Sequence, residues 1–593
     1  MTLTWTKLHE DDGLEARHQR GLAAARKKAL ALGLDRWLYP FQFEDVVRAS
    51  LKQSLLLTYQ MGLGKTRVTI ALAQLYGSQR NLVVVPKRLM GEWVTEFRAV
   101  GLANELHVVE TLEDCRNLRR FNLVAITDLW RLPDDSPLRR AGDDRYRRGA
   151  NYRSHLRGDR VVEDMGLHHS LASILRKRFG FVAVDEAYSL KDMEANQTKA
   201  VTHLRAKHKV LLTGTPVRGY PNNILSLLNW AFGNGSAVWP EYSFFVEGAV
   251  EKFLRRFGTY VYYDEQHRRT GDRGKKKLLP KIRDPQGFQE MLAPKMIRRL
   301  NTEPEVMAAV RIPEPHLRYE AIEMDEQHRR AYQVVLADFR AWYEAAKEEA
   351  EAEGRTLGRQ QILPKLTALI GCASFPQLLD PDWKEPTAKQ RRALQIVEDA
   401  IREGRKIILL SRNKEGARWM HKRIERLGCD PLYVDGGVSL ELNRRTWTSP
   451  RIERIDAFRR SPFHRVLVAT TPCLAEGLNI PEASVVVFLD YDWVPSVMAQ
   501  AFSRVLRPQQ ERDVHVHFLT CRGTIEEYME LLCDCKRKAI AEGLDYEEYD
   551  FRLEDLPDIK AYAEALVTSP EVLEKFTRRR FVAGYEREEG QGE

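Results

Sequence analysis

The feature that most constrains the fold is a repeated alternation of short apolar runs with amphipathic stretches. The pattern recurs between residues 36 and 230 and returns after residue 385. Strands that alternate with helices typically form a parallel sheet covered by helices on both faces. The sequence therefore predicts an α/β protein with two parallel-sheet lobes. The expected strands are 54–59, 82–85, 123–127, 181–184 and 210–213 in the first block, and 407–411, 465–470, 485–490 and 514–520 in the second.

The length agrees with several units, because 593 residues exceed what a single hydrophobic core supports. The segment 320–370 is rich in Ala, Glu, Arg and Gln, which predicts charged, protruding helices. We expect helical insertions both between and within the lobes. The expected organisation is an N-terminal helical extension over 1–35, a first lobe over 36–303 with insertions at 131–170 and 250–290, a helical linker with protrusions over 304–385, a second lobe over 386–540, and a C-terminal helical extension and tail over 541–593.

The positive charge of the chain is concentrated in two segments. The formal net charge is +9, which is small for this length. Residues 131–160 carry nine Arg against five Asp, and residues 268–283 carry eight basic residues against one acid. Such segments suit contacts with a nucleic-acid backbone, although a charge run is also an ordinary solvated surface.

Targeting and redox signals are weak. The N-terminus lacks the apolar core of a signal peptide, and no run of about 18 apolar residues predicts a membrane span. The seven cysteines are scattered and do not suggest a disulfide framework. We expect a protein without membrane contact in a reducing cytoplasm, bacterial, archaeal or phage-encoded, or in the nucleus if the host is eukaryotic.

A glycine-rich loop follows the first expected strand. The strand 54–59 leads through Gln60 into a loop that ends in Lys-Thr before a helical stretch at 68–75. Strand, glycine loop, Lys-Thr and helix form the arrangement that cradles phosphates, with Lys on the outer phosphates and Thr on Mg²⁺. The strict eight-residue pattern is broken by Tyr59, so an ordinary turn stays an alternative. The loop residues are Met61, Gly62, Leu63, Gly64, Lys65 and Thr66.

An acid pair follows a later strand of the same lobe. The apolar run 181–184 ends in Asp185 and Glu186. Carboxylates at the carboxyl end of a parallel strand suit Mg²⁺ binding by Asp185 and orientation of an attacking water by Glu186. Together, loop and acid pair predict a nucleotide site with Mg²⁺.

Segments in a fixed order resemble the motifs of the superfamily-two helicase-like ATPases, most closely the Swi/Snf family of DNA translocases. Residues 61–66, 185–188 and 212–216 resemble motifs I, II and III. Residues 38–42 resemble the adenine-reading Q motif, and residues 84–87 with Trp93 and Glu96 resemble motif Ia. Three further segments resemble numbered motifs: residues 406–411 resemble motif IV, residues 469–471 with 476–479 resemble motif V, and residues 500–509 resemble motif VI. Other segments that resemble the family between these motifs are 296–299 with 312–313, 435–436 with 455–458, 490–493 and 523–527.

The resemblance implies two RecA-like lobes that close around ATP and a role for each motif residue. Arg504 and Arg507 would neutralise transition-state charge, and their spacing of three would place both on one side of a helix; a solvated helix face is the alternative. The implied catalytic residues are Lys65, Asp185, Glu186, Arg504 and Arg507. Nucleotide contacts are implied for Gln42, Met61, Gly62, Leu63, Gly64, Lys65, Thr66 and Gly477, metal contacts for Thr66 and Asp185, nucleic-acid contacts for Lys87, Thr127, Arg412, Thr470 and Thr471, and coupling for Thr213, Gly214 and Thr215.

Some positions depart from the family pattern. Tyr59 and Gln60 replace the acidic pair usual before the Met of motif I, and Tyr188 replaces the usual His of motif II. Cys473 to Glu476 stand where motif V usually has small residues. None of these changes removes a catalytic group, and they suggest a divergent member.

The resemblance implies an ATP-dependent motor that hydrolyses ATP when bound to nucleic acid, most simply double-stranded DNA contacted at its phosphates. A strand-separating DNA or RNA helicase and a motor subunit that remodels a protein–DNA complex stay open. Protein partners in a repair, recombination or defence complex would fit the small flanking segments. A degenerate scaffold without hydrolysis is disfavoured by the intact catalytic residues.

Overall fold

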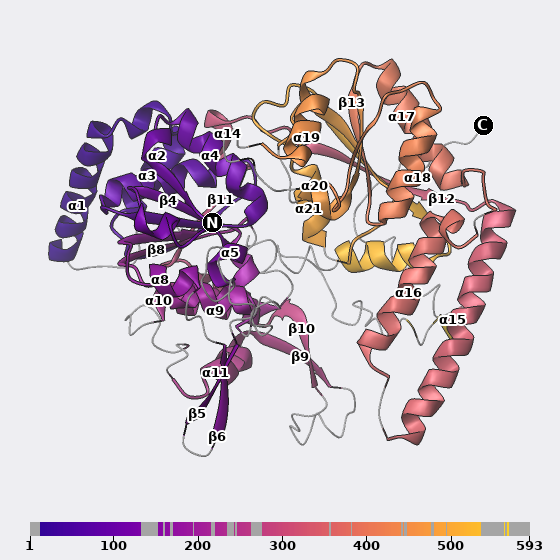
Figure 1. Cartoon of the computed structure of the whole chain (residues 1–593), viewed down its shortest axis with the longest axis horizontal. Coiled ribbons are helices and arrows are strands. Elements are labelled where there is room, and N and C mark those ends of the chain that lie inside the picture. Colours follow the sequence, from indigo (N-terminus) through magenta and orange to yellow (C-terminus); the bar gives the residue numbers. More distant parts are fainter. Residues whose placement is uncertain are drawn as a thin grey trace. The chain divides into compact units, whose positions relative to one another are not determined.

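A computed structural model of the chain divides into two units, the first mainly up to Arg311 and the second mainly from Ile312 onwards. Figure 1 labels the elements along the chain. Each unit is described by itself. The structure describes residues 12–131, 152–157, 160–165, 170–193, 195–214, 220–233, 242, 246–262, 276–354, 357–380, 382–439, 443, 448–475, 479–493, 495–534, 563 and 566–567.

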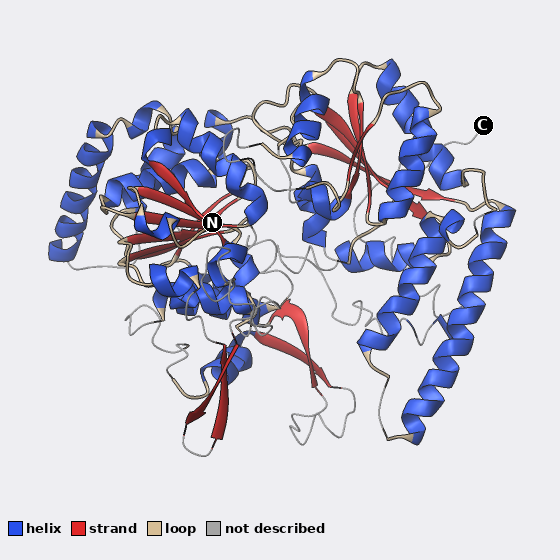
Figure 2. Ribbon diagram, in the orientation of Figure 1, coloured by secondary structure: helices blue, strands red, loops and turns tan. Residues whose placement is uncertain are grey.

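The first unit is built on a parallel sheet of seven strands in the order β11-β1-β8-β7-β2-β4-β3. Its central strands are continuous apolar runs, as expected when helices cover both faces (Figure 2). The strands are β1 (Ser54–Tyr59), β2 (Asn81–Val85), β3 (Leu106–Val109), β4 (Phe121–Ala125), β7 (Phe181–Val184), β8 (His208–Leu212) and β11 (Met296–Arg299).

Helices of the first unit connect these strands, and two antiparallel hairpins, β5–β6 and β9–β10, extend from it. The described residues of the insertion expected at 131–170 form the hairpin β5–β6, and the insertion expected at 250–290 contains the hairpin β9–β10 together with helical residues of α11 and α13. The hairpins are β5 (Tyr152–Arg157) with β6 (Arg160–Met165) and β9 (Gly258–Tyr262) with β10 (Lys276–Ile282). The helices are α1 (Asp12–Ala31), α2 (Pro40–Ala49), α3 (Lys65–Tyr76), α4 (Met90–Ala99), α5 (Ile126–Trp130), α8 (Leu171–Leu175), α9 (Asn196–His203), α10 (Leu225–Phe232), α11 (Ala249–Phe257), α13 (Pro285–Leu292) and α14 (Pro304–Ala309).

The second unit contains a parallel sheet of six strands in the order β12-β17-β16-β13-β15-β14. Alternate residues of β13 enter two hydrophobic clusters: Ile408 and Leu410 join one, and Ile407 and Leu409 join the other. Side chains alternate across a strand, so both faces of this sheet are buried. The strands are β12 (Pro315–Ile322), β13 (Lys406–Ser411), β14 (Leu432–Val434), β15 (Val466–Thr470), β16 (Ala483–Phe488) and β17 (Val514–Cys521).

Two long helices, α15 and α16, extend side by side from the second unit (Figure 1). They match the charged, protruding helices expected over 320–370, and their buried aromatic residues Tyr332, Phe339 and Tyr343 join the larger cluster. The helices of this unit are α15 (Glu326–Ala352), α16 (Arg359–Ser374), α17 (Ala388–Arg402), α18 (Lys414–Glu425), α19 (Pro450–Arg460), α20 (Thr471–Ala475) and α21 (Pro495–Phe502).

The predicted α/β fold with two parallel sheets is confirmed, with differences in detail. The strand expected at 123–127 ends at Ala125, and the next residues form α5. The segment 304–385, expected to be a helical linker, also contains β12, which lies at the edge of the second sheet. β12 begins with a proline, which an edge strand tolerates because it need not donate to a neighbour on both sides. No helix among the described residues is long and apolar enough to cross a membrane.

Candidate functional site

The turn between β1 and α3 is shaped by two glycines in the left-handed region. Gly62 and Gly64 have φ angles of 89° and 77°. A Cβ added at Gly64 would lie 2.5 Å from Nε2 of Gln42, so both space and backbone angle require glycine here. Gly64 is the N-cap of α3 and offers no side-chain oxygen to its first N–H groups. A helix end of this kind favours an anion such as phosphate.

The predicted nucleotide residues of the first unit lie together around this turn. Gln42 is fully buried on α2, and its Nε2 donates to the carbonyl oxygen of Leu63 over 2.8 Å. Lys65 begins α3 and donates from Nζ to the carbonyl oxygen of Tyr59 over 3.0 Å. Thr66 follows on the same helix, and Met61 lies in the turn. The structure thus brings Gln42 and the loop residues into one site.

Asp185 directly follows the last residue of β7, and β7 is separated from β1 in the sheet by the single strand β8. Its carboxylate accepts hydrogen bonds from Nε1 of Trp93 and from the N–H of Glu186, both at 2.8 Å. Burial, together with the charge of Glu186, raises the pKa of Asp185 to about 6, against the opposing effects of Trp93 and the charge of Lys65. A cation placed here would favour the ionised carboxylate.

Glu186 has a φ of 46°, a left-handed conformation that no other non-glycine residue shows in the described part of the chain. Such a backbone costs on the order of 1–3 kcal/mol and is often found at functional sites. It turns the chain sharply after Asp185 into a short 3₁₀ helix that begins at Ala187. The two carboxylates therefore belong to successive residues, of which Glu186 has a positive φ and Asp185 does not.

The residues expected to couple the two sites follow β8, which lies between β1 and β7 in the sheet. The N–H of Thr213 donates to the carbonyl oxygen of Leu57 over 3.1 Å. A Cβ added at Gly214 would lie 3.5 Å from Cγ of Met61 and 3.8 Å from Nζ of Lys65. Gly214 thus lies beside the glycine turn and Thr213 contacts strand β1, whereas Thr215 is outside the described residues.

Magnesium commonly retains waters and binds one or two carboxylates together with substrate phosphates. The described residues contain no group of three or more His, Cys, Asp and Glu arranged for a metal. The buried carboxylate of Asp185, near Lys65 and the start of α3, fits a Mg²⁺ site in which one carboxylate and the substrate phosphates share the ion, with the hydroxyl of Thr66 as a further ligand. The donor set therefore suits Mg²⁺ held jointly with a nucleotide.

The predicted nucleic-acid contacts of the first unit follow the next two strands of the sheet. Lys87 comes after β2 and is exposed, and Thr127 is the second residue of α5, after β4. Both face Asp128: Nζ of Lys87 is 3.8 Å from Oδ2, and Oγ1 of Thr127 donates to Oδ1 over 3.4 Å. Burial raises the pKa of Asp128, with the charge of Lys87 acting against it.

The corresponding residues of the second unit also lie at the carboxyl ends of their strands. Arg412 follows β13, Thr470 ends β15, and Thr471 begins α20. The Nε of Arg412 is 3.8 Å from Oδ2 of Asp492. Thr470 and Thr471 are buried.

Arg504 and Arg507 come after α21, which ends at Phe502, so they do not share a helix face. They are 8% and 9% exposed, which argues against the solvated surface that was the alternative. The carbonyl oxygen of Arg504 accepts a hydrogen bond from the N–H of Ile480 over 2.8 Å. Gly477 and most of the two basic segments lie outside the described residues.

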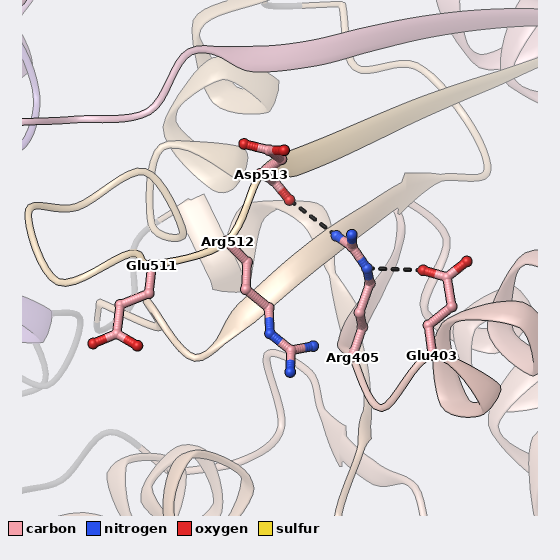
Figure 3. A pocket seen from close by; sticks show the side chains of 5 residues that line it. All are labelled: Glu403, Arg405, Glu511, Arg512 and Asp513. Atoms are coloured by element: carbon pink, nitrogen blue, oxygen red, sulfur yellow. Dashed lines mark hydrogen bonds and ion pairs between the residues drawn. The ribbon is translucent and has the colours of Figure 1, made fainter.

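A shallow depression on the second unit has a different character (Figure 3). Its two arginines bind groups of the protein itself: Nε of Arg405 is 2.8 Å from Oε2 of Glu403, and Arg512 donates to the carbonyl oxygen of Gly404 over 3.0 Å. It lies where β13 and β17 begin, whereas ligands of parallel sheets bind where strands end. The lining residues are Glu403, Arg405, Glu511, Arg512 and Asp513.

Two groups around the nucleotide turn were not assigned a role from the sequence. Trp93, which the sequence indicates only as part of motif Ia, orients the carboxylate of Asp185 by donating to it from Nε1. Asp45 on α2 binds Tyr59 and Arg299, which belong to different strands. Its spacing of three from Gln42 was the available signal, because residues three apart share one side of a helix.

Comparison with known proteins identifies the family. The family described as SNF2-related domain matches residues 27–377, and the helicase conserved C-terminal domain matches residues 388–509. The resemblance to the Swi/Snf motifs is thereby confirmed. The first match alone covers more than half of the chain.

Individual relatives are distant. The chain is 24% identical over 519 residues to the DNA annealing helicase and endonuclease ZRANB3 of Mus musculus, covering 86% of this chain and 41% of that protein. It is 23% identical over 488 residues to the uncharacterized ATP-dependent helicase MG018 of Mycoplasma genitalium, covering 80% and 38%. A solved structure, the SWI2/SNF2 ATPase core of Sulfolobus solfataricus in complex with double-stranded DNA, is 20% identical and covers 91% of this chain and 96% of that one, with a TM-score of 0.33.

The chain spans less than half the length of the curated relatives it matches. Both domain matches lie in the order in which the two sheets occur along the chain. The chain therefore belongs to the SNF2-related family.

Proposed function

We propose that the chain is an ATP-dependent motor that hydrolyses ATP at the carboxyl edge of the first sheet. The observation that carries the proposal is the meeting of Lys65, Asp185 and the open N-terminus of α3 around a glycine turn. Phosphoryl transfer to water needs positioning and charge neutralisation, and this arrangement supplies both. Membership of a family whose relatives are named ATP-dependent helicases supports it.

Each residue then has a defined task. Backbone N–H groups of Gly62 to Thr66 and Nζ of Lys65 would bind the phosphates, and Gln42 would contact the adenine. Thr66 and Asp185 would hold Mg²⁺, which supplies positive charge against the β- and γ-phosphates when bound. Glu186 would orient the attacking water and accept its proton.

We further propose that the second unit completes the site. Arg504 and Arg507 would approach the γ-phosphate in the closed state, and an arginine supplied in this way adds roughly 10³–10⁵-fold in rate. Gly477 would contact the nucleotide. Thr213, Gly214 and Thr215 would transmit the state of the nucleotide to the nucleic-acid contacts, because Gly214 lies beside Met61 and Lys65.

We propose that the motor moves along double-stranded DNA, which is called its track below. Lys87 and Thr127 of the first unit and Arg412, Thr470 and Thr471 of the second would each contact phosphates, which gives tracking without reading of sequence. A curated relative named as a DNA annealing helicase supports DNA over RNA. Closing and opening of the units around ATP would change the distance between the two sets of contacts.

The test is ATP turnover measured with duplex DNA, single-stranded DNA, forked DNA and RNA, together with a strand-displacement assay. We expect the greatest stimulation by duplex DNA, without displacement. Lys65→Ala and Glu186→Gln serve as controls and should both lower the stimulated turnover, by on the order of 10²-fold or more. Turnover that is equal in the unmodified chain and both variants would contradict the assigned site, and stimulation by RNA alone would contradict the proposed track.

A further inference from the structure

Asp45 is a buried carboxylate that joins three parts of the first unit. It lies on α2 and is only 2% exposed. Its Oδ2 accepts from the hydroxyl of Tyr59 over 2.6 Å and from Nε of Arg299 over 2.7 Å. Its Oδ1 accepts from a second guanidinium nitrogen of Arg299, also over 2.7 Å. The bidentate geometry gives a fixed direction as well as charge compensation.

Through Asp45 and Gln42, helix α2 holds both ends of the nucleotide turn. At one end Asp45 fixes the side chain of Tyr59, whose carbonyl oxygen accepts from Nζ of Lys65. At the other end Gln42, three residues earlier on the helix, donates to the carbonyl oxygen of Leu63. A displacement of α2 would therefore move the start of the turn and its end together.

The position of this carboxylate accounts for the departure at Tyr59. Tyr59 and Arg299 are partners in the parallel pairing of β1 with β11, so their side chains lie on the same face of the sheet. An acid at position 59, as in the family pattern, would lie beside Arg299. In this chain α2 provides the acid instead, and the hydroxyl of Tyr59 binds to it.

Arg299 also extends the network towards the end of the first unit. A guanidinium nitrogen lies 2.8 Å from Oε2 of Glu303 and 2.9 Å from Oε2 of Glu305. Glu303 is the N-cap of α14, and the main segment of the first unit ends shortly after this helix, at Arg311. One arginine thus connects the nucleotide turn with the helix that precedes the second unit.

We propose that Asp45 is a positioning residue for nucleotide binding: it takes the place of the acid missing at position 59 and fixes the nucleotide turn to Arg299. The proposal rests on the proposed function, since it assumes that the turn binds ATP. Asp45 does not touch the nucleotide; it acts through Tyr59 and Arg299. The chemistry involved is recognition of the triphosphate, and the predicted defect lies in affinity.

The test compares Asp45→Asn with Glu44→Gln in the full chain. Glu44 neighbours Asp45 on α2 and forms an exposed ion pair with Arg26, so its variant is a matched loss of one charge. Binding of a fluorescent ATP analogue with Mg²⁺ is measured without nucleic acid, followed by steady-state turnover and the thermal midpoint. We expect Asp45→Asn to weaken binding and raise KM by on the order of tenfold, as for loss of a charged hydrogen bond, with kcat nearly unchanged. Glu44→Gln should behave like the unmodified chain.

A third variant relocates the carboxylate. Asp45→Asn combined with Tyr59→Asp places the acid at the position of the family pattern and should recover most of the lost affinity. Equal affinities for Asp45→Asn and Glu44→Gln, or a fall in kcat without a change in KM, would overturn the positioning role. If the double variant does not fold, the comparison of the two single variants decides alone. Binding that is absent in the unmodified chain would instead contradict the proposed function itself.

Discussion

Each unit contains a strand that leads through a short loop into a helix beginning with lysine, but the N-termini of the two helices are capped differently. In the first unit β1 leads to α3, which begins at Lys65 after the N-cap Gly64. In the second unit β13 leads to α18, which begins at Lys414 after Asn413. The side chain of Asn413 accepts from the N–H of Gly416 over 2.9 Å. The same local architecture therefore leaves one helix end open to a phosphate and caps the other.

The lysines of the two units differ in the same way. Lys65 binds a backbone carbonyl oxygen and lies near Asp185, in a position to meet a ligand. Lys414 is 3.3 Å from Asp435, and Lys389 is 2.5 Å from Glu526, with neither member of the latter pair exposed. Lys65 thus lies at the turn proposed to bind the nucleotide, whereas Lys414 and Lys389 form ion pairs within the second unit. Variants of these residues can test that difference.

The largest expected effect is on the stability of the second unit, from Lys389→Met. Oε1 of Glu526 also accepts from Oγ of Ser374 over 2.6 Å, so the pair is part of a closed network. Removing one member of a buried ion pair leaves the other charge uncompensated and costs about 3–5 kcal/mol. Urea unfolding followed by circular dichroism should show this loss in one transition. Lys414→Met, which removes an exposed partner, should cost less than about 1 kcal/mol; equal losses would contradict the distinction.

The next largest effect is on turnover, from Lys65→Ala. Loss of one preorganised charge at the transition state costs on the order of 10²–10³-fold in kcat. The unfolding midpoint should stay close to that of the unmodified chain, since Lys65 makes its described contact to a carbonyl oxygen at the edge of the sheet. Lys414→Ala is the matched change at the helix start of the second unit. A similar fall in turnover from both variants would show that the two helix ends are equivalent.

The sequence was sufficient for the strands that lie inside the sheets and for the nucleotide turn. β1 and β7 have the predicted bounds because both faces of a central strand are buried and its apolar run is continuous. The strands β3, β11, β12 and β14 were not predicted, because they lie at the edges of their sheets, where one side needs no partner. Their half-buried residues, such as Arg298 and Arg299 in β11, give no continuous apolar run.

The candidate site was predictable where its residues form a short motif that follows a strand directly in the sequence. Gly64, Lys65 and Asp185 could be found because loop and acid pair each follow a strand directly. The role of Asp45 could not, since its partner Arg299 is 254 residues away in the sequence. The acid at Asp128 was also missed, because its importance depends on two neighbouring strands, β2 and β4, lying side by side.

A smaller effect, limited to low pH, is expected from Glu320 on β12. Burial alone would raise the pKa of Glu320, but hydrogen bonds from His517 and Arg392 outweigh it and lower the pKa from 4.5 to about 2. A carboxylate with a depressed folded-state pKa stabilises the fold above pH 4.5, and this contribution is lost as the pH falls towards 2. The contribution is at most about 3 kcal/mol.

Urea unfolding at pH 6 and pH 3 measures this contribution. Glu320→Gln should be less stable than the unmodified chain at pH 6, and the difference should shrink at pH 3. Glu323→Gln is the matched control, because Glu323 is exposed and forms its ion pair with Arg522 at the surface. A difference between Glu320→Gln and the unmodified chain that does not change with pH would contradict the assigned cause.

In one respect the two units are alike: a proposed phosphate contact in each lies 3.8 Å from a carboxylate of its own unit. The pairs are Lys87 with Asp128 and Arg412 with Asp492. A DNA phosphate that binds either cation must compete with the neighbouring carboxylate. Ion pairs with one exposed member contribute about 0–1 kcal/mol, so the competition is weak but acts on both contacts.

Asp128→Asn and Asp492→Asn should therefore each strengthen duplex-DNA binding, by up to about fivefold at low salt. The two effects should multiply in the double variant, because the residues belong to different units and share no partner. Fluorescence anisotropy with a labelled duplex measures the affinity over a series of salt concentrations, and the gain should diminish as salt screens the carboxylates. Glu105→Gln, which removes the same charge from a surface pair with Arg120, controls for net charge. If it strengthens binding as much as Asp128→Asn does, the effect comes from the charge of the whole chain, and the carboxylates beside Lys87 and Arg412 have no special place at the track.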